Sequence, residues 1–220
     1  MLYNFFMPTP DQGVIQMLRE HGHGVLFAND DWKTADIAIF TGGEDVHPIF
    51  YGQDIIASTI SNLRRDKREV SIYRNLPIAM PKVGICRGAQ FLNIMSGGSM
   101  WQHVDNHTRS HEVFACDYDD ESFEVSSTHH QMMRPGPEGW VMWAAQECHR
   151  VEDDKEILDV TKDADFMEAE LVYYHHTNSL CCQPHPEYPG FKKLTEAFFE
   201  HVNNMFENDV KKAREKKAVK

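Results

Sequence analysis

The sequence predicts an α/β fold with a central, mostly parallel sheet, helices on both faces and a few extra antiparallel strands. In the first half of the 220-residue chain, short apolar runs alternate with helical patterns, which is typical of a parallel sheet covered on both sides. After the glycine pair at 97–98, strand-like pieces alternate with turn residues. No internal repeat or linker divides this pattern. We therefore expect one domain over residues 1–208 and a basic tail over 209–220.

The individual elements follow from local signals. Thr9 can cap a helix that has Pro10 at its first position and runs to about residue 21. The other elements are predicted from apolar periodicity and turn residues, as strands at 2–7, 25–28, 36–40, 82–85, 113–116, 123–125, 141–145, 170–174 and 179–183, and helices at 58–76, 87–95 and 191–206.

Composition excludes several classes of function. A net charge of -12 argues against a general nucleic-acid binder, which needs surplus Lys and Arg to neutralise phosphates. No apolar run approaches the roughly 20 residues that span a bilayer, so we expect no membrane partner. The first ten residues lack a basic region and a cleavage site, and the five cysteines are irregularly placed. We therefore expect a cytoplasmic protein with reduced thiols.

The motif Gly84-Ile-Cys86-Arg-Gly88 lies between a predicted strand and a predicted helix. It is the cysteine counterpart of the nucleophile elbow, in which glycines allow a sharp turn that raises the nucleophile above the sheet. A thiol there faces a helix N-terminus, which favours the thiolate. Alternatively, Cys86 is a small buried residue at a strand end. The motif needs partners before it indicates catalysis.

The segment Gln183-Pro-His-Pro-Glu187 supplies such partners. A cysteine nucleophile needs a base, and the base needs a group that fixes its tautomer. His185 and Glu187 are two residues apart, so their side chains leave an extended segment on the same side. The flanking prolines stiffen this segment. The alternative is an ordinary proline-rich turn with a surface histidine.

Acyl transfer also needs donors for the oxyanion. The N–H of Arg87 directly follows the nucleophile, and the loop 41–45 could supply a second donor because its glycines allow close backbone approach. Gln90, one helical turn after Cys86, would present its amide to the same mouth.

Together these pieces resemble the class I glutamine amidotransferase-like family, which has a flavodoxin-like fold, and specifically its γ-glutamyl hydrolase branch. The blocks that carry the resemblance run from about residue 36 to 190, and they are TGGEDVHPIFY at 41–51, RDKRE at 65–69, GICRGAQFLN at 84–93, GGSMWQ at 97–102, STHHQ at 127–131 and QPHPE at 183–187. Each block alone is weak, but their ordered set is specific.

The resemblance implies a cysteine hydrolase that cleaves a small γ-glutamyl compound through a γ-glutamyl thioester, without a cofactor. It would make Cys86 the nucleophile, His185 the base and Glu187 its orienting partner. Oxyanion donors are implied at two backbone positions, Gly43 and Arg87. Recognition of the glutamyl head is implied for Gln90, Ser127, Thr128, His129 and His130.

The sequence departs from this branch at three positions outside the catalytic set. Ser126 stands where asparagine is frequent, His103 where aspartate is common, and Pro184 where aromatic residues are frequent. Any of these departures could change the substrate that fits, so the sequence does not predict the amine half of the γ-glutamyl compound.

Three alternatives compete with this interpretation. His103, His107 and His111 are spaced by four, but the residues between them make a poor helix, and we expect no metal. A glutaminase subunit that supplies ammonia to a partner synthase would share the catalytic residues. A non-catalytic interaction protein would not need an intact Cys-His-Glu set. The expected partner is a small γ-glutamyl substrate, with a synthase under the second alternative, and a homodimer remains open.

Overall fold

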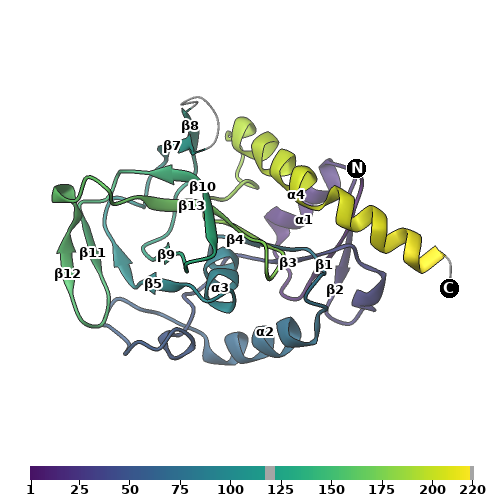
Figure 1. The fold of residues 1–220 in the computed structure, drawn as a ribbon, viewed down its shortest axis with the longest axis horizontal. Coiled ribbons are helices and arrows are strands. Elements are labelled where there is room, and N and C mark those ends of the chain that lie inside the picture. The colour runs from purple at the N-terminus through teal and green to yellow at the C-terminus, as the bar shows by residue number, and fades with distance from the viewer. Residues whose placement is uncertain (117–121, 219–220) are drawn as a thin grey trace.

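The computed structural model describes residues 1–116 and 122–218 and is built around a nine-stranded mixed sheet (Figure 1). In spatial order its strands are β2 (Gly24–Phe27), β1 (Asn4–Met7), β3 (Ile37–Phe40), β4 (Lys82–Ile85), β14 (Ser179–Cys182), β13 (Glu168–Tyr174), β10 (Gly139–Ala145), β7 (His111–Ala115) and β8 (Ser122–Val125). The predicted α/β class is confirmed, with a larger antiparallel part than the sequence suggested.

The parallel half of the sheet runs from β2 to β14. All four pairings within it are parallel. Every residue of β3, β4 and β14 is buried, as expected for parallel strands that helices cover on both faces. Because parallel strands end at the same edge, the segments that follow β3, β4 and β14 meet there. These segments begin at residues 41, 86 and 183.

The antiparallel half extends this sheet from β14 through β13, β10, β7 and β8. Two small sheets flank it. One joins β12 (Ile157–Asp159), β11 (Arg150–Glu152) and β6 (His103–Val104), and the other pairs β5 (Ser99–Trp101) with β9 (Met132–Arg134). Three short 3₁₀ helices complete the described elements, at Trp32–Thr34, Pro48–Phe50 and Val160–Lys162.

Helices cover the parallel half on both faces. The apolar sides of α1 (Gln12–Glu20) and α4 (Lys192–Ala218) pack on one face, together with Phe5 and Met7 of β1. Residues of α2 (Leu63–Asn75) and α3 (Arg87–Met95) pack on the other, together with Phe6. Figure 1 shows α2 and α3 below the sheet and α1 and α4 above it. Among the described residues, no helix has both the length and the apolar content to cross a membrane.

The expected helix boundaries need three corrections. The first helix begins after Asp11, whose carboxylate accepts the N–H of Val14 at 3.0 Å, and not after Thr9. The Thr9 hydroxyl instead donates to Glu69 at 2.6 Å, so a distant contact overrides its capping propensity. The second helix begins after Asn62, five residues later than expected. The last helix continues through the expected basic tail as far as Ala218.

The turn between β4 and α3 brings two glycines against neighbouring backbone. A Cβ on Gly88 would lie 2.0 Å from the carbonyl oxygen of Phe40, and a Cβ on Gly84 would lie 2.3 Å from the carbonyl oxygen of Gly88. Backbone atoms cannot give way as a flexible side chain can. The two glycines therefore allow α3 to start directly above the ends of β3 and β4.

Replacing Gly88 by Ala should destabilise the protein by about 3 kcal/mol, because the new methyl group must displace the backbone of β3. Gly52→Ala is the matched control. Its Cβ would meet nothing within 4 Å, although Gly52 has a φ of +73°, and it should cost only about 1 kcal/mol of backbone strain. Urea unfolding of both variants measures the difference. Equal losses would contradict the close approach of α3 to β3.

Candidate active site

Cys86 lies in the turn between β4 and α3, at the carboxyl edge of the parallel strands. Its φ of 51° and ψ of −113° form a conformation that residues with a Cβ rarely adopt, and such strain clusters at functional sites. The N–H groups in the first turn of α3 have no partner within the helix, and they point to the end at which Cys86 lies. The structure therefore places Cys86 on the strand-to-helix elbow that its motif predicts.

His185 and Glu187 leave the segment that follows β14 on the same side. Nδ1 of His185 lies 2.6 Å from Oε1 of Glu187, so the carboxylate fixes the orientation of the ring. Gly42 lies between this ring and the cysteine, because a Cβ built on it would be 3.2 Å from Cε1 of His185 and 3.9 Å from Cβ of Cys86. The three residues that the sequence selected are thus brought together.

The charge of His185 depends on its two anionic neighbours. Burial disfavours the imidazolium, but the sulfur of Cys86 and the carboxylate of Glu187 outweigh this effect and raise the pKa of His185 to about 11. At neutral pH the ring is therefore a cation that can pair with a thiolate and later donate a proton.

Two further residues hold His185, and neither role was expected from the sequence. The hydroxyl of Ser126 accepts the backbone N–H of His185 at 2.8 Å and donates to its carbonyl oxygen at 3.0 Å. The ring of Tyr188 stacks on the imidazole, with centroids 4.4 Å apart and planes 11° apart. Ser126 contacts the backbone of the histidine, so its departure from asparagine changes the support of His185.

The two expected oxyanion donors lie beside Cys86 in one cavity of about 220 Å³. Arg87 is the first residue of α3, so its N–H has no helical partner. Gly43 has a φ of +141°, which few residues other than glycine adopt. The guanidinium of Arg87 is buried and makes short ion pairs with Asp66 and Glu69 of α2, so the side chain anchors the elbow to α2.

Arg65 of α2 holds the loop that carries Gly43. Its guanidinium donates to the carbonyl oxygen of Gly42 at 2.9 Å, to that of Thr41 at 3.0 Å and to the carboxylate of Glu69 at 3.0 Å. The RDKRE block was part of the family resemblance, but its role could not be derived from local pattern. The structure explains it as a clamp on both candidate oxyanion donors.

Four of the five residues expected to bind the glutamyl head line the 220 Å³ cavity. These are Gln90, Thr128, His129 and His130. Ser127 does not line it, because its hydroxyl donates to the carbonyl oxygen of His107 at 2.7 Å. In this structure the side chain of Ser127 instead holds the loop in place.

Two acidic residues that were not expected from the sequence also line this cavity, Glu44 and Asp45. Nε2 of His130 lies 3.1 Å from Oδ2 of Asp45, and this hydrogen bond raises the pKa of His130. The cavity therefore presents carboxylates and a histidine. These groups can pair with the α-ammonium and α-carboxylate of a glutamyl head.

A second, larger cavity opens on the other side of His185. Its volume is about 770 Å³, and it is lined by α1, the loop at Gly42 and Gly43, and residues 185–196. Gly43 borders both cavities. The two cavities therefore lie next to each other at the loop that carries Gly43, with Cys86 lining the smaller one and His185 the larger one.

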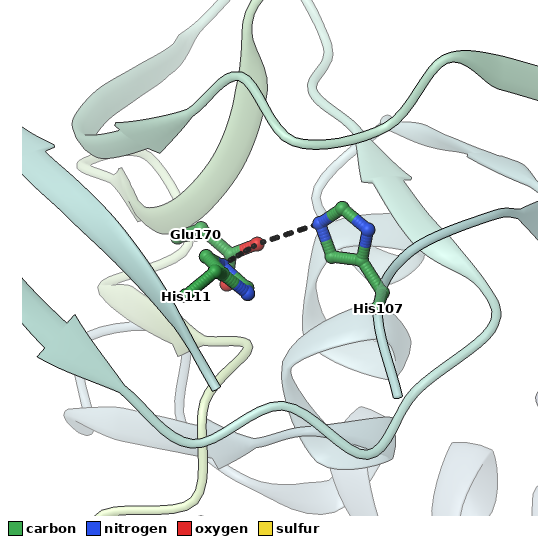
Figure 2. A group of neighbouring side chains, drawn as sticks. All are labelled: His107, His111 and Glu170. Carbon is green, nitrogen blue, oxygen red and sulfur yellow. Dashed lines mark ion pairs between the residues drawn. The ribbon is translucent and has the colours of Figure 1, made fainter. Parts of the chain in front are cut away.

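The three histidines spaced by four do not all lie together. His103 lies 3.5 Å from His130 near the smaller cavity. Figure 2 shows that His107 and His111 instead face Glu170 of β13, inside the antiparallel part of the molecule. As the sequence indicated, the residues between these histidines form no helix, and His111 begins a strand.

The pKa of His185 should fall by about 1 or more in Cys86→Ala, since the variant lacks one of the two groups that favour the imidazolium. A lower pKa means that the ring loses its proton at a lower pH. Histidine NMR titration measures this, with His185→Gln to assign the signal. An unaltered His185 titration would contradict the proposed pairing of sulfur and ring.

Sequence comparison agrees with this geometry. Residues 27–187 match the model of the Peptidase C26 family. A Rickettsia prowazekii protein, described as a candidate glutamine amidotransferase-like protein, is 40% identical over 75 residues, covering 33% of this chain and 27% of that protein. A Lactococcus lactis protein of the same description is 28% identical over 153 residues, covering 56% of this chain and 64% of that protein. The chain thus spans less than two thirds of these relatives.

Solved structures share the fold over nearly the whole chain. A Thermoplasma acidophilum protein, described as a candidate component of GMP synthase, aligns with a TM-score of 0.65 and 14% identity over 99% of this chain and 98% of that chain. A Thermotoga maritima glutamine amidotransferase aligns with a TM-score of 0.56 and 11% identity, over 98% and 92%. The matched family region contains the elbow and the His-Glu pair, and we conclude that this chain belongs to the Peptidase C26 family, whose fold is that of the class I glutamine amidotransferases.

Proposed function

We propose that this protein is a cysteine hydrolase that cleaves the γ-glutamyl amide bond of a small compound through a γ-glutamyl thioester on Cys86. The observation that carries the proposal is the elbow at Cys86, whose strained backbone places the sulfur beside a histidine oriented by Glu187. Nucleophile, base and orienting carboxylate are the three parts that cysteine acyl transfer requires.

The reaction proceeds in two acyl transfers. The thiolate of Cys86 attacks the side-chain carbonyl, and the backbone N–H groups of Gly43 and Arg87 stabilise the oxyanion. The imidazolium of His185 gives its proton to the leaving amine as the C–N bond breaks. The neutral ring then takes a proton from water, which attacks the thioester and releases glutamate and the thiolate.

The glutamyl head occupies the smaller cavity. Glu44 and Asp45 pair with its α-ammonium group, and His130 pairs with its α-carboxylate. Gln90 supports this pocket, since its amide donates to the carbonyl oxygen of Gln131 at 3.2 Å and to Oε1 of Gln183 at 3.3 Å. These contacts keep the cavity about 220 Å³ in volume, which suits a single amino-acid head.

The amine half occupies the larger cavity. His185 must protonate the leaving nitrogen, so this nitrogen lies beside the ring, and the cavity of about 770 Å³ opens from there. Its lining includes four carboxylates, those of Asp11, Glu20, Glu187 and Glu196, and a single lysine, Lys192. This excess of carboxylates favours a neutral or cationic amine over an acidic amino acid.

A glutaminase that serves a partner synthase is the main alternative, because the same three residues would perform its chemistry. The larger cavity counts against it, since departing ammonia needs no such space. An extended amine gains binding energy there that can lower the barrier of the chemical step.

Purified protein should hydrolyse γ-glutamyl amides of cationic amines with a higher kcat/KM than glutamine, without any added protein. γ-Glutamyl-glutamate should be a poorer substrate than either neutral or cationic amides. Cys86→Ala should lower kcat by about 10⁴-fold or more, and Glu187→Gln by about 10³-fold. Cys116→Ser, at an exposed position outside both cavities, is the control. If glutamine is the best substrate, or a second protein is required, the glutaminase alternative replaces this proposal.

The proposed binding of the amine half in the larger cavity can be tested separately, by filling part of this cavity with a larger side chain. Gln16 lines this cavity from α1, whereas Gln12 of the same helix does not. Gln16→Trp should lower kcat/KM for γ-glutamyl amines at least about 10-fold, since lost contacts in a pocket cost roughly 1–3 kcal/mol, and should leave glutamine hydrolysis unchanged. Gln12→Trp should affect neither substrate. An equal loss of kcat/KM for glutamine would contradict the binding of the amine half in this cavity.

A further inference from the structure

A buried group of histidines and glutamates lies next to the candidate active site and takes no part in its chemistry. His107 follows β6, His111 begins β7, His129 lies in the loop before β9, and Glu168 and Glu170 belong to β13. All five side chains are buried. Figure 2 shows His107 and His111 directed at the carboxylate of Glu170 from two different segments.

Backbone carbonyls fix the tautomers of two of these histidines. Nδ1 of His107 lies 2.9 Å from the carbonyl oxygen of Asp105, and Nδ1 of His129 lies 2.8 Å from that of Gln131. A carbonyl oxygen can only accept, so each Nδ1 carries the hydrogen and, in the neutral ring, each Nε2 presents a lone pair to the cluster. This is the arrangement in which histidines bind metals, with the second ring nitrogen held by an outer hydrogen bond.

The inner atoms of the cluster lack hydrogen-bond partners among the described residues. They are Nε2 of His129, both ring nitrogens of His111 and both carboxylate oxygens of Glu170. Nε2 of His107 and Oε2 of Glu168 lie 2.9 Å apart, but they form no hydrogen bond of good geometry. The other oxygen of Glu168 is satisfied by the N–H groups of residues 147 and 148. Lone pairs that face one another in a buried space repel unless a cation lies between them.

No lysine or arginine supplies that cation in the described structure. There, Glu168 and Glu170 form ion pairs with histidines alone. A divalent ion would balance both carboxylates and accept a lone pair from each histidine that reaches it.

The distances fit a small metal ion. Oε1 of Glu170 lies 3.6 Å from Nε2 of His107, 3.4 Å from Nε2 of His111 and 3.9 Å from Nε2 of His129. Ligands about 2.1 Å from a tetrahedral zinc ion are about 3.4 Å from one another. The ligand atoms of His107, His111 and Glu170 all lie within 4.8 Å of one another, so side-chain adjustments would bring these three around one ion.

We propose that His107, His111 and Glu170 bind one divalent transition-metal ion of the zinc type, with a water molecule in the fourth position. The Nε2 atom of His129 lies beside this group, 3.9 Å from Oε1 of Glu170. Imidazole and carboxylate ligands suit zinc, cobalt and nickel better than calcium or magnesium, which prefer oxygen alone. None of these three ligands lines the cavity that contains Cys86, so the role of the ion is structural.

The metal would brace the segments that support the active site. The carbonyl oxygen of His107 accepts the N–H of His129 at 3.1 Å and the hydroxyl of Ser127 at 2.7 Å. The carbonyl oxygen of Glu170 accepts the N–H of Gln183 at 2.8 Å, two residues before His185. One ion therefore fixes the glutamyl-binding loop to the strand beside the candidate base.

The full-length protein, treated with a chelator and then given one equivalent of Zn²⁺ or Co²⁺, should keep about one ion per chain after desalting. Zn²⁺ should raise the thermal midpoint by about 5 °C or more. His111→Ala and Glu170→Gln should lower metal affinity at least about 10-fold and lose the thermal gain. His176→Ala, a partly exposed histidine outside the cluster, should behave as wild type.

The cobalt-loaded wild-type protein makes the test independent of whether the variants fold. A tetrahedral site with nitrogen and oxygen ligands gives visible ligand-field bands without the intense near-ultraviolet band of a cobalt thiolate. A thiolate band would place the ion at a cysteine and overturn the proposal. Wild-type protein that keeps no metal, or variants that keep as much as wild type, would overturn it as well.

Discussion

The site depends most on a buried network of two arginines and two carboxylates. Arg87 at the elbow pairs with Asp66 and Glu69 of α2, and Arg65 joins Glu69 to the carbonyls of the loop at Gly42. The two arginines balance the two carboxylates, so no charge in this buried network is unpaired. Loss of one member would leave an uncompensated charge at a cost of about 3–5 kcal/mol. This network sets the positions of both candidate oxyanion donors.

That dependence explains how a strained residue can persist at position 86. A positive φ in a residue with a Cβ costs of order 1–3 kcal/mol and survives only where the surroundings determine it. Gly84 and Gly88 allow the close approach of α3, and the ion pairs of Arg87 hold the start of the helix. The backbone strain and the buried charges are thus two parts of one arrangement.

The parts of the site that the sequence predicted are those that local chemistry determines. The elbow at Cys86 needs glycines within two residues, and the pairing of His185 with Glu187 needs only an extended, proline-flanked segment. The α/β alternation followed from periodicity for the same reason. Each of these signals lies within one short segment of the chain.

What the sequence could not predict depends on contacts between distant segments. Thr9 looks like a helix cap, but Glu69 takes its hydroxyl and the helix begins after Asp11. Ser127 lies in the loop expected to bind substrate, but His107 takes its hydroxyl. The contact of Ser126 with His185 and the larger cavity likewise form only when distant segments pack. The apolar periodicity of a sequence does not indicate such contacts between distant segments.

Two pairs of buried acidic residues lie beside the active site, Asp66 with Glu69 and Glu168 with Glu170. Their negative charges are balanced in different ways. Asp66 and Glu69 are neutralised by arginines that also reach backbone carbonyls, so the first group needs no ligand. Among the described residues, Glu168 and Glu170 form ion pairs with histidines alone. Two of these histidines direct their Nδ1 hydrogens to carbonyls and away from the carboxylates. Glu168 and Glu170 are equally buried but have no lysine or arginine partner in the part of the chain that the structure describes. Their charge must therefore be balanced by protons or by a metal ion. Because this group holds the strand that leads to His185, what neutralises it determines how firmly the candidate base is supported.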